Sequence, residues 1–296
     1  MTRVLVRAFA ALLALALLGV VAVWGVVTFL RAQDGEPRAA ERCTAVNEGV
    51  RHPLSHEQAE NAALLAAASV RRGMPARAAT IAIATAMQES SLRNLDHGDR
   101  DSLGLFQQRP SQGWGEPEEI LDPVYSTHTF YDALDEVAGY EQMEVTVAAQ
   151  SVQRSAFPEA YAQHEPMSRA WASALTGHSP GAVTCVVHSP AEGSTEALLE
   201  RLERDLGELP VELEDPQDGP ARLEIDARPL AGAGGEGVER LAWAVGQWAV
   251  ALSAPLGVEE VTVGERRWDV KDARWSALAE DAEPVGPGRV RLRLNG

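Results

Sequence analysis

The sequence predicts a mainly α domain followed by a small α+β domain, with a transmembrane helix ahead of both. An uninterrupted apolar run, Ala8–Leu30, stands first, and Ala-rich helical segments then continue to about residue 188. After Pro190 the composition changes and strand-like alternation begins. We therefore expect four regions: a membrane anchor (1–30), a stalk (31–43), the α domain (44–188) and an α+β accessory domain (189–296).

The apolar run has the length of a bilayer-spanning helix, and Arg3 and Arg7 precede it. It is longer than the apolar part of a typical signal peptide, and no good Ala-x-Ala cleavage site follows it. We expect contact with the cytoplasmic membrane through residues 8–30, as a single-pass cell-membrane protein with the bulk of the chain extracytoplasmic. If the segment is cleaved instead, the chain is secreted.

Composition excludes some partners. The chain of 296 residues is 45% hydrophobic, enough for a folded core, and its net charge is −17. A strongly acidic chain is a poor partner for nucleic acid, since phosphate binding needs a basic surface. The seven histidines show no metal-ligand spacing, so we expect no metal and no cofactor.

Two cysteines, Cys43 and Cys185, bracket the predicted α domain. A pair of this kind in an exported chain indicates a disulfide, which would stabilise the domain by roughly 4–5 kcal/mol in the chain-entropy model. Two unpaired buried thiols are the alternative.

The α domain opens with a capping box, Ser55-His56-Glu57-Gln58, ahead of an Ala-rich helix that runs to about Arg72. A second Ala-rich helix is predicted from Pro75 to Leu92, followed by a Gly- and Pro-rich loop over residues 93–118. Further helices are predicted at about 119–137, 145–155, 158–163 and 165–176.

The accessory domain is predicted to contain an acidic amphipathic helix, 194–206, and an apolar helix, 238–253. Strands are predicted within 207–220 and at 221–227, 258–263, 266–270 and 289–294. Four tryptophans of this region, Trp243, Trp248, Trp268 and Trp275, could form a ligand platform. Their helical or strand spacing is more typical of a core.

Glu89 is the candidate for acid–base chemistry. It follows Ala82, Thr85 and Ala86 on one helix face, near the helix's C-terminal end. Apolar surroundings and the helix dipole both favour the protonated carboxyl, which is the form that a general acid at a glycosidic oxygen needs. On the helix pattern alone, a solvated carboxylate is the more common situation.

The segment after this helix carries a resemblance. Glu89-Ser90 followed by Gly104-Leu105-Phe106-Gln107 resembles the first two motifs of the soluble lytic transglycosylase and goose-type lysozyme superfamily, and in particular an actinobacterial membrane-anchored variant. The resemblance covers about residues 55–176. It implies a lysozyme-like fold, Glu89 as the catalytic acid and Ser90 as support for its helix. It also implies that Gly104, Phe106 (in place of Met) and Gln107 line the cleft, with Gln107 contacting saccharide.

The third motif of that family, Ala-Tyr-Asn-Ala-Gly, is absent in that form. The segment Ala149–Tyr161 stands near its expected place and resembles a variant of lysozyme-like domains. The resemblance then implies Tyr161 as the cleft tyrosine and Gln153 as a substrate contact.

The implied substrate is the glycan strand of peptidoglycan, cleaved between N-acetylmuramic acid and N-acetylglucosamine by a lytic transglycosylase with one catalytic Glu. An inverting hydrolase would need a second carboxylate, for which Asp96, Asp99 and Asp101 are the candidates. The altered third motif keeps another alternative open, a non-catalytic wall-binding or scaffold protein.

Overall fold

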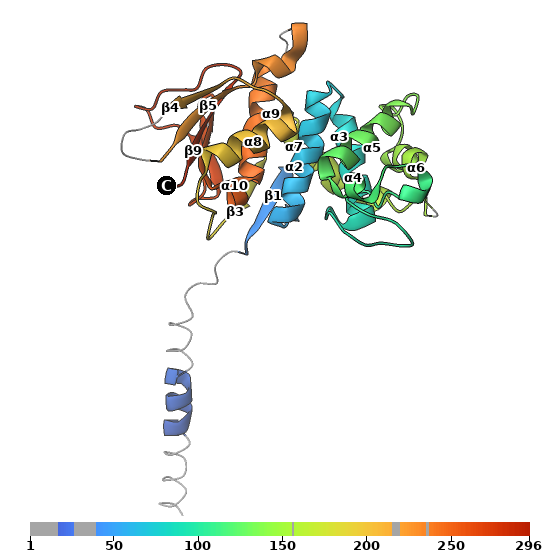
Figure 1. Cartoon of the computed structure of the whole chain (residues 1–296). Coiled ribbons are helices and arrows are strands. Elements are labelled where there is room, and N and C mark those ends of the chain that lie inside the picture. Colours follow the sequence, from blue (N-terminus) through green and yellow to red (C-terminus); the bar gives the residue numbers. More distant parts are fainter. Residues whose placement is uncertain (1–16, 27–39, 156, 215–219, 235–236) are drawn as a thin grey trace, which may run out of the picture. The chain divides into compact units, whose positions relative to one another are not determined.

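The computed structural model describes residues 17–26, 40–155, 157–214, 220–234 and 237–296. The chain divides into two units, Met1–Ala40 and Glu41–Gly296. In the first unit residues 17–26 are helical. All other described elements belong to the second unit (Figure 1).

A three-stranded antiparallel sheet begins the second unit. Its strands are β1 (Arg42–Asn47), β2 (Val50–Leu54) and β3 (Val183–Val186), in the order β2-β1-β3. Glu48 and Gly49 connect β1 to β2, both with positive φ (49° and 78°), as a two-residue hairpin turn requires. In the register of β1 with β3, Cys43 lies opposite Cys185, and the two form a disulfide. The predicted disulfide is therefore confirmed.

Helices make up most of the region between these strands. α2 (His56–Arg71) has the predicted capping box, in which Ser55 and Gln58 bond each other's backbone N–H groups. α2, α3 (Ala76–Ser90) and α7 (Glu165–Leu175) pack together through buried alanines, whose small side chains allow close approach. The remaining elements here are η1 (Pro110–Gln112), α4 (Pro117–Leu121), α5 (Pro123–Asp135), α6 (Val145–Gln153) and η2 (Ala162–His164).

The C-terminal half is built on a six-stranded antiparallel sheet in the order β4-β5-β9-β6-β7-β8. Its strands are β4 (Val211–Glu214), β5 (Arg222–Asp226), β6 (Val258–Val263), β7 (Arg266–Asp269), β8 (Arg274–Ala277) and β9 (Arg289–Leu294). The helical elements are α8 (Thr195–Leu206), η3 (Arg228–Gly234), α9 (Val238–Ala251) and α10 (Ser253–Leu256).

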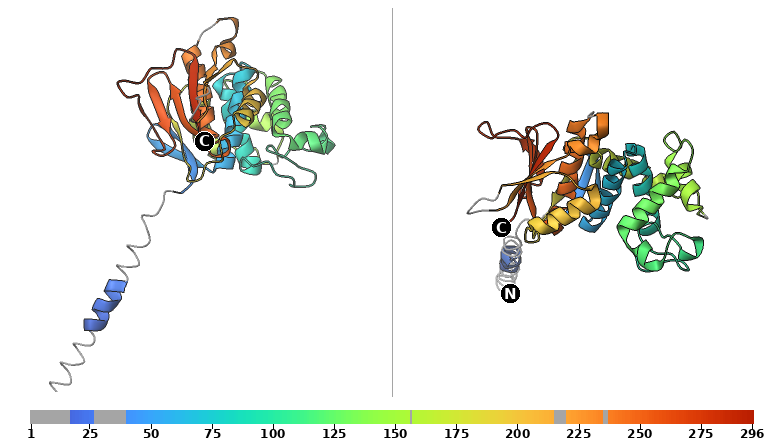
Figure 2. Two further views of the ribbon diagram at one scale, coloured as in Figure 1. Left: turned by 60° about the vertical axis from the view of Figure 1, so that its left-hand side comes forward. Right: turned by 45° about the horizontal axis from the view of Figure 1, so that its top comes forward.

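α9 lies between the large sheet and the helical region. On the sheet side Gly246 is needed, since a Cβ there would lie 2.6 Å from Cγ2 of Val263. On the other side the buried Gln247 donates to the Ala174 carbonyl (2.6 Å) and accepts from the N–H groups of Ala182 and Val183 (2.8 and 2.9 Å). In Figure 2 the orange and red strands of the sheet lie on one side of this unit and the green helices α4–α6 on the other.

The predicted fold class is wrong. A mainly α lysozyme-like domain followed by a small α+β domain does not describe a structure whose described residues are 47% helix and 18% strand and form two antiparallel sheets. Strands β2 and β3 and most of β1 lie inside the region expected to be α, and β1 pairs with β3 over a long sequence distance that a local pattern does not reveal. Several predicted elements are confirmed, including the two Ala-rich helices and the strands at 258–263 and 289–294. The helix predicted at 119–137 is two helices, because Asp122 caps a new one that starts at Pro123.

The expected transmembrane helix also needs correction. Over the part of the chain that the structure describes, no helix is both long enough and apolar enough to cross a bilayer. Much of the apolar run, residues 8–16 and 27–30, lies outside the described residues. The proposed region limits at 30, 43 and 188 stay predictions.

Candidate active site

Glu89 lies in the last turn of α3, where the chain reverses sharply. The helix ends at Ser91 in a left-handed conformation (φ 55°), and the Leu92 N–H returns to the Ala86 carbonyl (3.0 Å). The Glu89 side chain is half-buried and lines a hollow of about 520 Å³, which we call the Glu89 hollow.

The hydroxyl of Tyr161 donates to Oε1 of Glu89 (2.7 Å). Tyr161 is fully buried, 72 residues along the chain from Glu89. Burial, together with the hydrogen bond to Glu89, raises the pKa of Tyr161 well above its ordinary value. The phenol therefore keeps its proton and acts as a hydrogen-bond donor that orients one carboxylate oxygen.

Ser90 ties the end of α3 to the loop that follows. Its Oγ lies 2.7 Å from the Leu105 carbonyl and 3.0 Å from the Ala86 carbonyl, and it accepts from the Arg93 N–H (3.2 Å). The side chain is only 5% exposed, so Ser90 braces the site and does not face the hollow.

The loop 103–108 is held by backbone pairing and by one buried aromatic ring. Leu103 and Gln108 exchange two N–H···O bonds of 2.9 Å each. Phe106 is fully buried and stacks on Phe130 with 4.3 Å between ring centroids, so its side chain supports the loop from beneath. Gly104 has φ +77°, and a Cβ at this position would lie 2.7 Å from the Ile120 carbonyl oxygen.

Gln107 and Gln153 both line the Glu89 hollow. Nε2 of Gln153, at the end of α6, donates to the Phe106 carbonyl (2.7 Å) and so joins α6 to the loop. Nε2 of Gln107 lies 3.3 Å from the carbonyls of His97 and Gly104. The structure thus brings Glu89, Tyr161, Gln107 and Gln153 together, whereas Gly104 and Phe106 are not among the residues that line the Glu89 hollow, and the roles of these residues stay predictions.

A second hollow, of about 790 Å³, continues from the first and is called the Val137 hollow. The two share four lining residues, Gln112, Trp114, Gln153 and Arg154. The Val137 hollow then extends to Glu136 and Val137 just after α5. Together they form one groove, which suits a chain-like substrate better than a small molecule.

The three candidate second carboxylates differ in their surroundings. Asp101 is clamped, with the Ser111 N–H on one oxygen (2.9 Å) and Nε of Arg109 on the other (2.6 Å), and these bonds hold its pKa well below its ordinary value. Asp96 is exposed and bonds its neighbour His97 (2.8 Å), which lowers its pKa. Asp99 lines the Glu89 hollow, and its side chain is 93% exposed.

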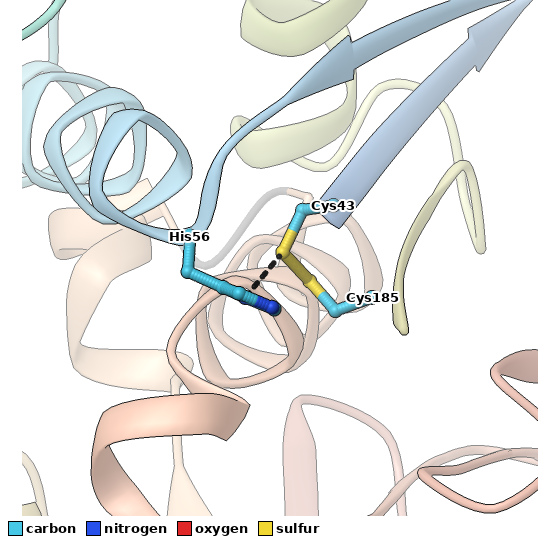
Figure 3. Close-up of side chains that lie close together, drawn as sticks. All are labelled: Cys43, His56 and Cys185. Atoms are coloured by element: carbon cyan, nitrogen blue, oxygen red, sulfur yellow. Dashed lines mark hydrogen bonds between the residues drawn. A yellow bond between two sulfur atoms is a disulfide. The ribbon is translucent and has the colours of Figure 1, made fainter. Parts of the chain in front are cut away.

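Figure 3 shows the disulfide with His56 beside it, Nδ1 of His56 lying 3.5 Å from Sγ of Cys43. Nε2 of His56 lies 3.1 Å from the Val186 carbonyl. Cys43, His56 and Cys185 have the proximity of a metal-ligand group. In the oxidised form the two sulfurs bond each other, so neither is available as a thiolate ligand.

No protein-family model matches the chain, and a search of curated proteins finds no match either.

Several residues that line the groove were not predicted from the sequence. Arg154 is a non-glycine residue with φ 52°, and Phe157, at the rim, is 74% exposed. Gln112 belongs to a Gly- and Pro-rich segment whose path is not readable from local sequence. The one usable signal was Trp114, an aromatic residue between two glycines close to the predicted cleft.

Proposed function

We propose that the chain is a peptidoglycan-cleaving glycosidase, most specifically a lytic transglycosylase. Its substrate is the β-1,4 bond between N-acetylmuramic acid and N-acetylglucosamine. The observation that carries the proposal is the Glu89 carboxyl, half-buried in a groove and bonded on one oxygen by the Tyr161 hydroxyl at 2.7 Å.

In the proposed mechanism Glu89 first acts as general acid. Protonated Glu89 gives its proton to the leaving O4 of N-acetylglucosamine as the bond from C1 of N-acetylmuramic acid breaks. The Glu89 carboxylate then takes the proton of the substrate's own 6-hydroxyl while O6 forms the new bond to C1. The products are a new 4-hydroxyl end and a 1,6-anhydro end, and Glu89 is protonated again.

The transglycosylase route is preferred over an inverting hydrolase because it needs one carboxyl group. Of the hydrolase candidates, Asp101 has both oxygens engaged by Arg109 and Ser111. Asp99 is the remaining candidate that lines the Glu89 hollow, and it is the residue a hydrolase would use to activate water.

The disulfide supports the same proposal. A disulfide persists in oxidising compartments outside the cytoplasm, where the wall polymer lies. The strong negative charge of the chain, −17, also disfavours nucleic acid as the polymer in the groove.

The test is digestion of purified peptidoglycan by the full chain, followed by mass spectrometry of the soluble products. We expect 1,6-anhydro ends. Reducing ends in place of anhydro ends would show that the enzyme is a hydrolase and not a transglycosylase. In that case we expect Asp99→Asn to abolish activity.

Failure of the wild-type chain to release any fragment would contradict both enzymatic hypotheses, the transglycosylase and the hydrolase. Retention of the chain on the undigested wall polymer would in that case support the wall-binding alternative.

A further inference from the structure

The C-terminal half carries a third hollow, of about 360 Å³, between the start of α9, the β6–β7 turn and the segment before β9. We call it the Trp243 hollow. Its floor includes the buried Ala242, Val263 and Val285. Its volume is at the lower end of the range for small-ligand pockets, which is the size for one sugar-sized group.

The tryptophans of the unit 41–296 differ in whether the indole N–H group has a hydrogen-bond partner. Four tryptophans donate to a partner within the protein: Trp171 to His52, Trp248 to Asp205, Trp268 to Thr184 and Trp275 to Val183. In the described part of this unit, the N–H groups of Trp114 and Trp243 have no such partner. Both of these residues line hollows, Trp114 the groove beside Glu89 and Trp243 the hollow named after it.

The Trp243 ring is held in place from behind. It packs against Trp275 with 4.9 Å between ring centroids, and Trp275 is itself fixed by its bond to the Val183 carbonyl (2.8 Å). A half-buried aromatic ring of fixed orientation, with a free polar N–H, offers an apolar face and a hydrogen-bond donor at the same time.

Three exposed charged groups stand on the rim: Glu239, Glu265 and Arg266. Among the residues that the structure describes, the side chains of these three have neither an ion-pair partner nor a hydrogen-bond partner. Arg289 also lines the hollow, but it is paired with Glu212 and Glu224, as most arginines of this sheet are paired. The unpaired groups here are therefore available to a ligand.

The mixture of groups selects the class of ligand. A cation would be attracted by the carboxylates of Glu239 and Glu265 and repelled by Arg266. An anion would be attracted by Arg266 and repelled by the two carboxylates. A pyranose ring uses all of them, because its hydroxyls both donate and accept hydrogen bonds and its apolar face packs on an indole.

We propose that the Trp243 hollow is a second saccharide site, which binds one pyranose unit of a glycan chain. It is separate from the Glu89 chemistry and would hold the polymer at a distance from the groove. The proposed site does not depend on whether Glu89 cleaves the glycan.

The test uses peptide-free glycan strands of peptidoglycan as the probe and the full chain with Glu89→Gln, which prevents turnover. Calorimetric titration is expected to show two sites per chain. Trp243→Ala should remove one of them, and the exposed-rim variants Glu265→Gln and Arg266→Gln should each weaken that site about 3- to 10-fold. Leu213→Ala, an exposed apolar residue of the same sheet outside the hollow, is the matched control and should change nothing.

Unchanged stoichiometry in Trp243→Ala, or rim variants with wild-type affinity, would overturn the proposal. Binding of free stem peptides but not of peptide-free strands would also overturn it, because the ligand would then be a zwitterionic peptide. If the groove binds nothing, one site that disappears in Trp243→Ala still supports the inference and counts only against the proposed function.

Discussion

Charged side chains on the C-terminal sheet are arranged differently from the polar side chains around Glu89. On the sheet, Arg289 and Arg291 of β9 pair with Glu224 of β5 across the strands, at 2.8 and 3.0 Å. Around Glu89, Gln153 and Gln107 bond backbone carbonyls and line an open groove. On β9 these charges are paired within the sheet, whereas the groove directs part of its polar surface to solvent.

The backbone shows the same contrast. Seven non-glycine residues of the described chain have positive φ, and five of them lie between residues 91 and 154: Ser91, Leu92, Arg100, Gln107 and Arg154. In the six-stranded sheet region Ala273 is the one such residue among those described. Because this conformation costs free energy in residues other than glycine, its concentration around the groove indicates that the loops there are shaped for a site.

The largest effect on stability is expected when β1 and β3 lose their cross-link. Replacing both cysteines, Cys43→Ala with Cys185→Ala, removes a cross-link over 142 residues. We expect the free energy of unfolding to fall by roughly 4–5 kcal/mol, measured by denaturant titration. An unfolding midpoint equal to that of the wild type would contradict the role of the disulfide as the main clamp.

The next effect concerns the loop below the groove. Gly104→Ala places a Cβ 2.7 Å from the Ile120 carbonyl oxygen at φ +77°. Its matched control is Gly139→Ala, where φ is +76° and no atom lies within 4 Å of the added Cβ. Both variants carry the cost of the left-handed backbone, about 1 kcal/mol, and the clash should add roughly 1–3 kcal/mol at Gly104 alone. Equal thermal stability of the two would show that the loop adjusts freely.

A smaller effect is expected from the hydrogen bond to the proposed acid. Tyr161→Phe removes the donor to Oε1 of Glu89, and we expect turnover to fall about 10- to 100-fold. Tyr131→Phe is the control, because its hydroxyl is also buried but bonds the Leu65 carbonyl (2.7 Å) away from the groove. Tyr131→Phe should lower stability and leave turnover unchanged. Equal loss of turnover in both would point to a general effect of destabilisation.

The smallest effect is a pH dependence of the sheet. Burial raises the pKa of Glu224, but hydrogen bonds from Arg289 and Arg291 outweigh it, so the pKa lies below the ordinary value of 4.5. Its ion pairs therefore stabilise the fold at pH values above 4.5, and this contribution is lost as the pH falls through the lowered pKa. Glu224→Gln should cost up to about 1 kcal/mol at pH 7 and progressively less in acid. If the difference in the free energy of unfolding between Glu224→Gln and the wild type grew as the pH fell, the lowered pKa assigned to Glu224 would be contradicted.

Local sequence signals predicted the helices better than the strands at the start of the chain. The capping box at Ser55 and the alanine spacing placed α2 and α3 almost to the residue. Strands β1 and β3 went unpredicted because each is short and gains its stability from a partner about 140 residues away. In the C-terminal half the alternation of β6 and β9 was readable, but the strand order was not, since it depends on pairing between distant segments.

Sequence reasoning named some of the residues that lie around the groove, but not the shape of the groove. The resemblance pointed to Glu89, Gln107, Gln153 and Tyr161, which line the Glu89 hollow or bond Glu89 in the folded chain. It did not reveal the left-handed backbone of Arg154 or the continuation of the groove to Val137. Both depend on the tertiary positions of α5 and α6, which no short motif encodes.

The role of Glu89 as the general acid is tested most directly by the turnover of Glu89→Gln, measured as the rate at which soluble fragments leave purified peptidoglycan. Glu57→Gln, an exposed glutamate in the first turn of α2, is the matched control. We predict a loss of about 10²–10⁴-fold for Glu89→Gln with an unchanged unfolding midpoint, and wild-type turnover for the control. Turnover in Glu89→Gln within a few-fold of the wild type would contradict the assignment of Glu89 as the general acid.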